Sequence, residues 1–411
     1  MVELLRRSRA GPQAAPDATT PREIETWLLT EAIAQDDLLT LVEGFVWRIV
    51  ASGIPLHRAS IHVGTLHPQL VGFAWNWEEQ DGICDEVKVG RGSLKTDSYL
   101  KNPIFQVIEH GRTVHGDPRN PSFAEKYSIM ATLAKSGITE YIAMPLRSSA
   151  TNHNVATAGT RHPDGFGEET FQTLQRLFQV FALHVERHIA VRLAGNISDI
   201  YLGPGAAAQV LSGSIERGAG STIDAVIWTS DMRGFTDLAD KLDPADMIQV
   251  LNAYFERLAG AVMENGGEVL KFIGDGLLAV FPFQTFETEG AAAHAALTAS
   301  IDATVAVERL NHEPTDVLSV IEGWRPLRSG IALHEGPVFF GNVGASDRLD
   351  FTVIGRAVNA TSRVEALSKA LDRSILISEP VAKRLDADLE HMGEHHLRGL
   401  AEPFSLFSPR L

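Results

Sequence analysis

Hydrophobic residues recur along the first half of the chain with two different periods. Apolar residues three or four positions apart predict amphipathic helices, whereas alternating apolar and polar residues predict half-buried strands. Together these elements predict one mixed α/β domain over residues 23–195. They are helices over 21–52, 98–111 and 167–194 and strands over 60–66, 70–77, 85–90, 138–146 and 154–160.

The second half of the chain predicts a separate domain over residues 222–411. Within it, residues 268–281 have two apolar arms around Gly274, Asp275 and Gly276, which is a strong β-hairpin signal. The order strand, helix, hairpin, helix, strand is the βαββαβ order of a ferredoxin-like fold, so the chain belongs to the α/β (α+β) class. The predicted elements are strands over 224–230, 328–336, 337–343, 350–355 and 375–378, helices over 244–265, 286–311 and 357–369, and a strand pair near 394–408.

Two segments lack long periodic patterns. Residues 1–22 are rich in Ala, Pro, Arg and Thr and predict a disordered tail. Residues 196–221 are rich in Gly and Ser and predict a linker with one short helix. No stretch reaches about 18 consecutive strongly apolar residues, and the N-terminus lacks the apolar core of a signal peptide. We therefore expect a cytoplasmic protein without a membrane span.

Composition restricts the partners. The formal net charge of −16 makes nucleic acids and anionic membrane surfaces poor partners. A phosphate-bearing ligand must then be held by local cations, metal ions or backbone N–H groups. The single cysteine, Cys84, excludes an intrachain disulfide and fits a reducing compartment. A lone cysteine is also more often a small buried apolar residue than a site that tethers a chromophore.

The first segment with candidate chemistry is TSDMRGFTDL at 229–238. Asp231 stands where a strand is predicted to end, and Gly234, Phe235 and Thr236 open the next helix. A carboxylate beside the backbone N–H groups of a helix start suits a metal ion that bridges to phosphates. The alternative is a helix cap, a role that Asp and Thr often fill. The segment by itself leaves both interpretations open.

The second and third segments are KFIGDG at 271–276 and DFTVIGRAVNATSRVE at 350–365. Asp275 occupies the hairpin turn, and Lys271 alternates with apolar neighbours, so its side chain leaves the face that they bury. Asn359 and Arg363 lie four residues apart on a predicted helix and therefore share a face. Taken one at a time, these are an ordinary turn aspartate, a surface lysine, a strand threonine at position 352 and two helix residues.

In combination, the three segments closely resemble the catalytic domain of class III nucleotidyl cyclases over about residues 222–408. The resemblance implies that Asp231 and Asp275 hold two Mg²⁺ or Mn²⁺ ions per site, which activate the ribose 3′-hydroxyl and neutralise the triphosphate. It also implies that the backbone around Gly234, Phe235 and Thr236 binds the phosphates. By the same resemblance, Asn359 orients the ribose and Arg363 stabilises charge on the reacting phosphorus.

The resemblance further assigns base selection to Lys271 and Thr352. Lysine donates and a threonine hydroxyl can accept, which matches N1 and the 6-amino group of adenine and mismatches guanine. The sequence therefore predicts an adenylate cyclase that converts ATP to 3′,5′-cyclic AMP and pyrophosphate. The alternatives are a guanylate cyclase and a catalytically silent nucleotide-binding homologue. The Gly-Gly-Asp-Glu-Phe signature of diguanylate cyclases is absent.

In the cyclase family, opposite subunits supply the metal ligands and the base-binding residues. The resemblance therefore implies a homodimer with two equivalent sites, because this chain carries both sets. Residues 23–195 are similar in element order to a GAF domain, a small-molecule sensing module. We expect this domain to regulate the cyclase through an unknown small-molecule ligand.

Overall fold

The computed structural model describes residues 2–146, 154–398 and 402–410. The chain divides into two compact units, Met1–Ile197 and Ser198–Leu411. Helix α7, Glu168–Leu202, begins in the first unit and ends in the second. Each unit has its own sheet.

The first unit is built on a seven-stranded sheet in which every neighbouring pair is antiparallel. In spatial order its strands are β1 (Val2–Ser8), β4 (Ile83–Gly90), β3 (Leu70–Glu78), β2 (Arg58–Gly64), β7 (Asn154–Thr160), β6 (Glu140–Leu146) and β5 (Val114–Gly116). Its helices before α7 are η1 (Gly11–Ala14), α1 (Pro21–Thr30), η2 (Ala32–Ala34), α2 (Leu38–Ala51), η3 (Arg91–Lys95), α3 (Asp97–Leu100), α4 (Pro103–His110), α5 (Pro121–Lys126) and α6 (Met130–Lys135).

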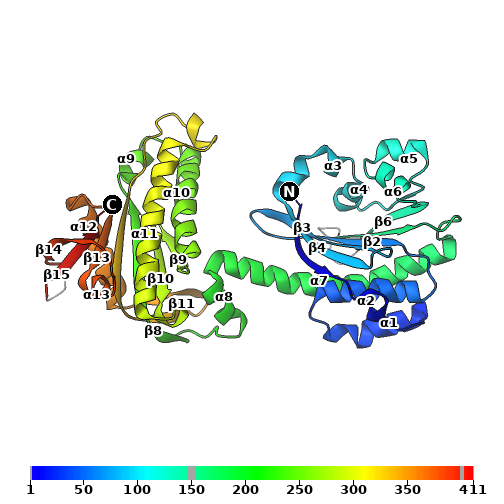
Figure 1. Ribbon diagram of the computed structural model, residues 1–411, viewed down its shortest axis with the longest axis horizontal. Coiled ribbons are helices and arrows are strands. Elements are labelled where there is room, and N and C mark those ends of the chain that lie inside the picture. The colour runs from blue at the N-terminus through cyan, green and yellow to red at the C-terminus, as the bar shows by residue number, and fades with distance from the viewer. Residues whose placement is uncertain (1, 147–153, 399–401, 411) are drawn as a thin grey trace. The chain divides into compact units, whose positions relative to one another are not determined.

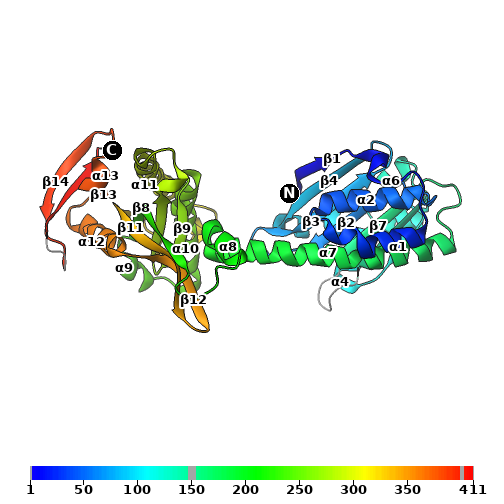
Figure 2. The same cartoon turned by 90° about the horizontal axis from the view of Figure 1, so that it is seen from below.

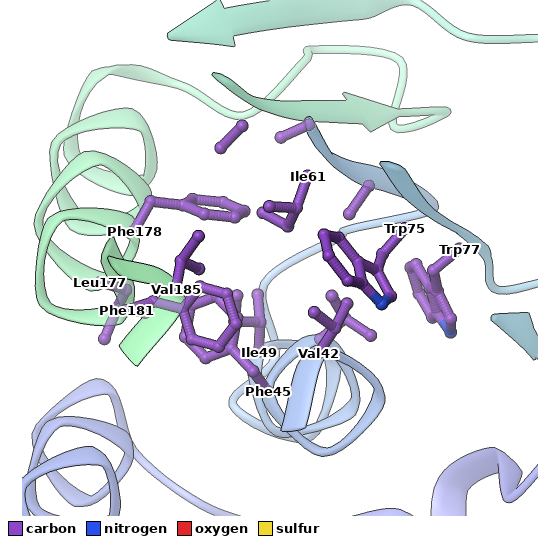
Figure 3. Packing of buried hydrophobic residues seen from close by; sticks show 14 of the residues in the cluster. Val42, Phe45, Ile49, Ile61, Trp75, Trp77, Leu177, Phe178, Phe181 and Val185 are labelled. Atoms are coloured by element: carbon purple, nitrogen blue, oxygen red, sulfur yellow. The ribbon is translucent and has the colours of Figure 1, made fainter. Parts of the chain in front are cut away.

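Helices cover both faces of this sheet. Helices α1, α2 and α7 lie along one face, where they form the larger core with β2 and β3 (Figures 1 and 2). In that core, Phe45 of α2 stacks on Phe181 of α7 with ring centroids 4.2 Å apart, and Trp75 and Trp77 extend from β3 (Figure 3). Helices α4–α6 cover the opposite face over a smaller core that includes Met130 and Tyr141. Cys84 is fully buried in the larger core, as expected for an apolar role, and burial raises the pKa of its thiol.

The N-terminus differs from the disordered tail predicted for residues 1–22. Strand β1 pairs with β4, and Arg7 donates to Asp85 at 2.6 Å. Glu43 of α2 is 1% exposed and accepts the backbone N–H of Ala10 at 2.8 Å. Composition alone did not reveal this order, because the partners lie more than thirty residues away in the sequence. The single helix predicted over 21–52 also differs, since it is divided into α1 and α2 by residues 31–37, with Asp37 capping α2.

The second unit contains an eight-stranded mixed sheet. Its strands follow the order β14 (Leu389–His395), β15 (Phe404–Pro409), β13 (Ile375–Ser378), β11 (Ser329–Ala345), β8 (Gly220–Met232), β10 (Gly276–Pro282) and β9 (Glu268–Ile273), and β12 (Arg348–Ile354) also pairs with β11. The helices are α8 (Pro204–Leu211), α9 (Phe235–Ala239), α10 (Pro244–Glu264), η4 (Phe283–Thr285), α11 (Glu289–His312), η5 (Leu318–Val320), α12 (Arg356–Ala370) and α13 (Glu379–Ala382). Only β11 and β13 run parallel among the described pairs.

Hydrophobic cores lie on both faces of this second sheet. Helices α10 and α11 lie side by side and pack on one face (Figure 1). Helix α12 and the start of α8 contribute to the other core. Of the described helices, α11 alone has the length and hydropathy to cross a membrane, and nine of its residues are buried in this fold.

The segment 196–221 differs from a simple linker. Its first residues continue α7, and the next form α8, whose Ala206 and Ala207 are fully buried. The backbone N–H of Ala206 donates to Glu268 of β9 at 3.2 Å. The small residues that gave this segment its flexible composition therefore allow α8 to approach the sheet closely.

Candidate active site

Asp231 lies near the end of β8, a central strand of the second sheet. It pairs with Gly330 of β11, while its neighbour Ser230 pairs with Leu277 of β10. The strand ends at Met232, and α9 begins at Phe235 after Gly234, whose φ of 76° is left-handed. Glycine adopts this conformation without steric cost, so the chain turns directly from strand to helix at this point. The predicted strand–turn–helix around Gly234, Phe235 and Thr236 is therefore present.

Asp275 occupies the tight turn between β9 and β10. Ile273 and Gly276 pair across the hairpin, and Gly274 between them has a φ of 62°. A Cβ at Gly276 would lie 2.7 Å from the carbonyl oxygen of Ser230 and 3.6 Å from Oδ1 of Asp231. The absence of a side chain at Gly276 thus lets the hairpin turn approach the end of β8. The predicted hairpin is present, and its turn lies beside Asp231.

The structure brings the two predicted carboxylates together. Partial burial of Asp231 and the negative charge of adjacent Asp275 raise the pKa of Asp231 to about 6. Two neighbouring carboxylates repel each other unless a proton or a cation lies between them. Their oxygen ligands suit Mg²⁺ or Mn²⁺, which take their other ligands from water and phosphate. The described residues contain no group of three or more His, Cys, Asp or Glu side chains arranged to hold a metal. Asp231 and Asp275 are therefore the acidic ligands that the protein would offer to these ions.

A third carboxylate, Glu365 of α12, lies near this pair and was not identified from the sequence. It lines a cavity of about 200 Å³ together with Asp231, Thr229 and Ser362. Burial first, and then the charge of Asp231, raise the pKa of Glu365 to about 7. The available signal was its spacing: Val358, Ser362 and Glu365 recur at helical intervals on the face of α12 that lines this cavity.

Lys271 of β9 forms an ion pair with Asp350 of β12. Asp350 and Thr352 lie two residues apart on β12 and therefore share a face of that strand. Thr352 is buried at 8% exposure, whereas the Lys271 side chain is 26% exposed. The structure therefore brings Lys271 to the strand that carries Thr352. Asp350 is the second site residue that the sequence analysis missed, although it is the first residue of the quoted DFT segment.

Asn359 and Arg363 lie on α12 as predicted, one helical turn apart. Asn359 is exposed and Arg363 is half-buried. In the described part of the chain, neither side chain forms a hydrogen bond or ion pair with Asp231 or Asp275, and neither lines the cavity beside Asp231. Within one copy of the chain, the structure therefore brings the aspartates together but does not join the helix pair to them.

Residues 220–407 match the family model described as the adenylate and guanylate cyclase catalytic domain. An adenylate cyclase of Anabaena cylindrica is 36% identical over 172 residues, which cover 42% of this chain and 33% of that protein. The terminal-differentiation-specific adenylate cyclase of Dictyostelium discoideum is 32% identical over 155 residues, or 37% of this chain and 7% of that protein. The chain thus spans a third or less of the length of these two relatives.

A solved structure, the adenylyl cyclase CyaB from P. aeruginosa, aligns with 46% of this chain and 95% of its own length, at 24% identity and a TM-score of 0.40. The guanylyl cyclase Cya2 aligns over 46% of this chain and 93% of its own, at 27% identity and the same TM-score.

Proposed function

Residues 220–407 belong to the adenylate and guanylate cyclase catalytic domain family, and from this premise we propose that the chain is an adenylate cyclase. The proposed reaction converts ATP to 3′,5′-cyclic AMP and pyrophosphate. The observation that carries it is the approach of Asp231 and Asp275 from two separate elements, close enough for one charge to shift the pKa of the other. Such a pair of carboxylates suits the binding of a substrate with its divalent cations.

We propose that Asp231 and Asp275 hold two Mg²⁺ or Mn²⁺ ions per site. When bound, these ions would supply charge neutralisation at the triphosphate and a lower pKa for the ribose 3′-hydroxyl. The protein would position the phosphates through the backbone N–H groups that follow Gly234, at Phe235 and Thr236. These groups lie at the start of α9, where N–H groups have no partner within the helix.

The choice of base rests on Lys271 and Thr352. The Lys271 amine can donate to N1 of adenine, and the Thr352 hydroxyl can accept from the 6-amino group. Guanine would present a donor to the lysine, and an unmatched buried polar group weakens binding strongly. This chemistry favours ATP over GTP, and guanylate cyclase activity is the alternative that a direct comparison of the two substrates tests.

We further propose that the active site is completed by a second copy of the chain. Asn359 would orient the ribose and Arg363 would stabilise negative charge at the reacting phosphorus, both from the copy opposite the aspartate pair. Among the described residues of one copy, no hydrogen bond or ion pair joins Asn359 or Arg363 to the aspartates, and this supports the sharing. Phe272 and Ile273 of the hairpin are 52% and 60% exposed, which is costly for large apolar side chains unless a partner covers them.

Helix α7 provides independent support for a homodimer. Ala190, Ala194, Ile197 and Tyr201 are all exposed, at intervals of four, three and four residues. This alternation of three and four is the spacing of a coiled-coil seam. Ile197 is 38% and Tyr201 81% exposed, so pairing of two α7 helices would remove apolar surface from water.

For the first unit we propose a GAF-like sensor that regulates the cyclase, and for the second a ferredoxin-like core. The seven-stranded sheet with helices on both faces supports the former, and the order β8, α10, β9, β10, α11, β11 supports the latter. We propose that the protein acts in the cytoplasm. Helix α7 ends at Leu202 and α8 begins at Pro204 after Gly203, which gives a physical route by which the first unit can influence the second.

The function is tested by measuring ATP and GTP turnover of the full chain with Mg²⁺ or Mn²⁺. We expect cyclic AMP to form and GTP to be a poor substrate. A catalytically silent nucleotide-binding homologue would bind ATP without turnover, and that result would refute the proposal. The presence of Asp231, Asp275 and Arg363 in this chain argues against a catalytically silent homologue.

Sharing of the site is tested by mixing two inactive variants, Asp231→Ala and Arg363→Ala. A heterodimer of these variants has one site with all wild-type groups, so activity should be partly restored. If heterodimers form and activity stays absent, the shared arrangement is wrong.

A further inference from the structure

We propose that the first unit binds a small zwitterion with an apolar body, that is, an apolar α-amino acid, in a cavity beside α7. The cavity has a volume of about 380 Å³ and lies between β2, β3, the start of α2 and α7. This size falls within the range of roughly 300–1,000 Å³ that is usual for small-molecule sites. The regulatory consequence below rests on the proposed cyclase function, whereas the binding site itself does not.

The inner wall of the cavity is apolar and rigid. Val63, Phe73 and Trp75 from β2 and β3 are 5%, 7% and 1% exposed, and Leu38 at the start of α2 is 7% exposed. These side chains also pack into the main core of the unit. They form a preformed surface for an aliphatic or aromatic group, and burial of that group would remove apolar area from water.

Most charges around the opening already neutralise one another. Glu86 is fully buried beneath two arginines, and it accepts from Arg6 Nε at 2.7 Å and from Arg192 Nη1 at 2.7 Å. Arg6 also donates to Asp37 at 2.7 Å, and Asp37 in turn caps α2. Arg192 lies over the ring of Phe73 at 4.0 Å. This group of two arginines and two carboxylates is internally balanced and leaves no charge for a ligand.

Two lining residues of opposite charge remain outside that balance. Arg187 donates to the backbone carbonyl of Gln35 at 2.6 Å and has no carboxylate partner in the described part of the chain. Asp36, the next residue after Gln35, lines the same cavity, and the described residues offer it no cation within 4.0 Å. A ligand carboxylate can accept from the remaining N–H groups of Arg187, and a ligand ammonium can donate to Asp36.

The remaining ionisable lining residue is His188. Burial, Arg187 and His184 lower the pKa of His188, and Asp36 and Asp37 oppose that shift. His188 is therefore mainly neutral at physiological pH, and it does not alter the pairing of one positive with one negative position. An α-amino acid matches this pattern because both of its charges are attached to one carbon, next to an apolar side chain.

The position of the cavity links binding to the proposed enzyme. Arg187 and Arg192 both belong to α7, which enters the second unit at Ser198. Arg187 and Arg192 precede Ser198 by eleven and six positions, or about 16 Å and 9 Å at 1.5 Å per residue. A ligand that fixes Arg187 acts on the part of α7 that leads into the catalytic unit, so it should change the rate of cyclic AMP formation.

The test uses the full-length chain and isothermal titration with L-leucine, L-methionine, L-phenylalanine and L-tryptophan. We expect saturable binding of at least one of them. For the amino acid that binds most tightly, the N-acetyl derivative lacks the ammonium and the carboxamide lacks the carboxylate, and each should bind at least tenfold more weakly. Failure of all four to bind at millimolar concentration overturns the proposal, as does binding of either derivative as tightly as the amino acid itself.

Substitutions at two exposed residues test which charged group of the ligand each residue binds. Arg187→Gln should weaken binding about tenfold and remove the difference between the amino acid and its carboxamide. Asp36→Asn should weaken binding similarly and remove the difference between the amino acid and its N-acetyl derivative. Arg176→Gln, on the same helix but outside the cavity, should leave the affinity unchanged. If both cavity variants bind like wild type, the assignment is wrong.

The readouts separate the two proposals. Binding without any ATP turnover would retain this site and refute the cyclase. Turnover that is present but does not respond to a ligand that binds would retain both the site and the enzyme and overturn the coupling through α7.

Discussion

Glu365→Gln should stabilise the metal-free protein at neutral and alkaline pH. The pKa of Glu365 rises from an ordinary 4.5 to about 7, first because the carboxyl is buried and then because Asp231 is close. The folded state therefore resists ionisation of this group. The resulting cost is absent below pH 4.5, grows as the pH rises from 4.5 to 7, and is complete above pH 7.

The size of the effect follows from these two values. The difference between these two pKa values corresponds to roughly 3 kcal/mol in the free energy of unfolding, at 1.36 kcal/mol for each tenfold change in proton affinity. Glutamine keeps the shape and removes the charge, so most of that cost should disappear. For a unit of this size, we expect the melting temperature at pH 8 to rise by roughly 5–10 °C.

Differential scanning calorimetry of the full chain in EDTA at pH 5 and pH 8 measures this effect. Leu333→Ala, a substitution in the core of the second unit, identifies the transition that belongs to that unit. Glu308→Gln, an exposed position on α11, is the matched control and should change little. The reasoning is refuted if Glu365→Gln has the same pH dependence as wild type, or if it is less stable at pH 8.

Three further predictions address other contacts. Asp275→Asn should abolish the stabilisation by Mn²⁺, which in the wild-type protein is about 2.7 kcal/mol at a Mn²⁺ concentration of 100 Kd. It should also lower turnover by roughly 10²–10³. A variant whose melting temperature rises with Mn²⁺ as much as that of the wild type would contradict this prediction. Asp350→Ala should raise KM for ATP by up to about fivefold with little change in kcat. The reason is that a partly exposed ion pair that holds Lys271 contributes roughly 1 kcal/mol or less. An unchanged KM in steady-state kinetics would count against this role of Asp350. Glu86→Ala should destabilise the first unit by roughly 1.5–3 kcal/mol in urea unfolding, because Arg6 and Arg192, which are themselves 50% and 37% exposed, lose their hydrogen bonds to a fully buried carboxylate. A loss below 1 kcal/mol would show that the ion pairs contribute little.

The sequence alone determined the features that depend on neighbouring residues. The hairpin over 268–281 was predictable because apolar alternation and the Gly-Asp-Gly turn lie within fourteen residues of each other. The helix that carries Asn359 and Arg363 was predictable from its 3.6-residue period. The assignment of Asp231 and Asp275 as candidate metal ligands came from the resemblance of the three segments to nucleotidyl cyclases, because a strand end and a turn by themselves leave a helix cap and an ordinary turn aspartate open.

Only the tertiary structure decided which distant residues meet. Asp350 lies 79 positions from Lys271 in sequence, and nothing local to either residue predicts their ion pair. Helical spacing places Glu365 on one face of α12 with Ser362, but only the packing of α12 against β8 shows that this face lies beside Asp231, where burial and the charge of Asp231 change the ionisation of Glu365. The order of the N-terminal residues likewise depends on β4 and on Glu43, not on the composition of residues 1–22. Local periodicity fixes the elements, whereas the electrostatic state of each polar side chain depends on contacts that form only when the elements pack.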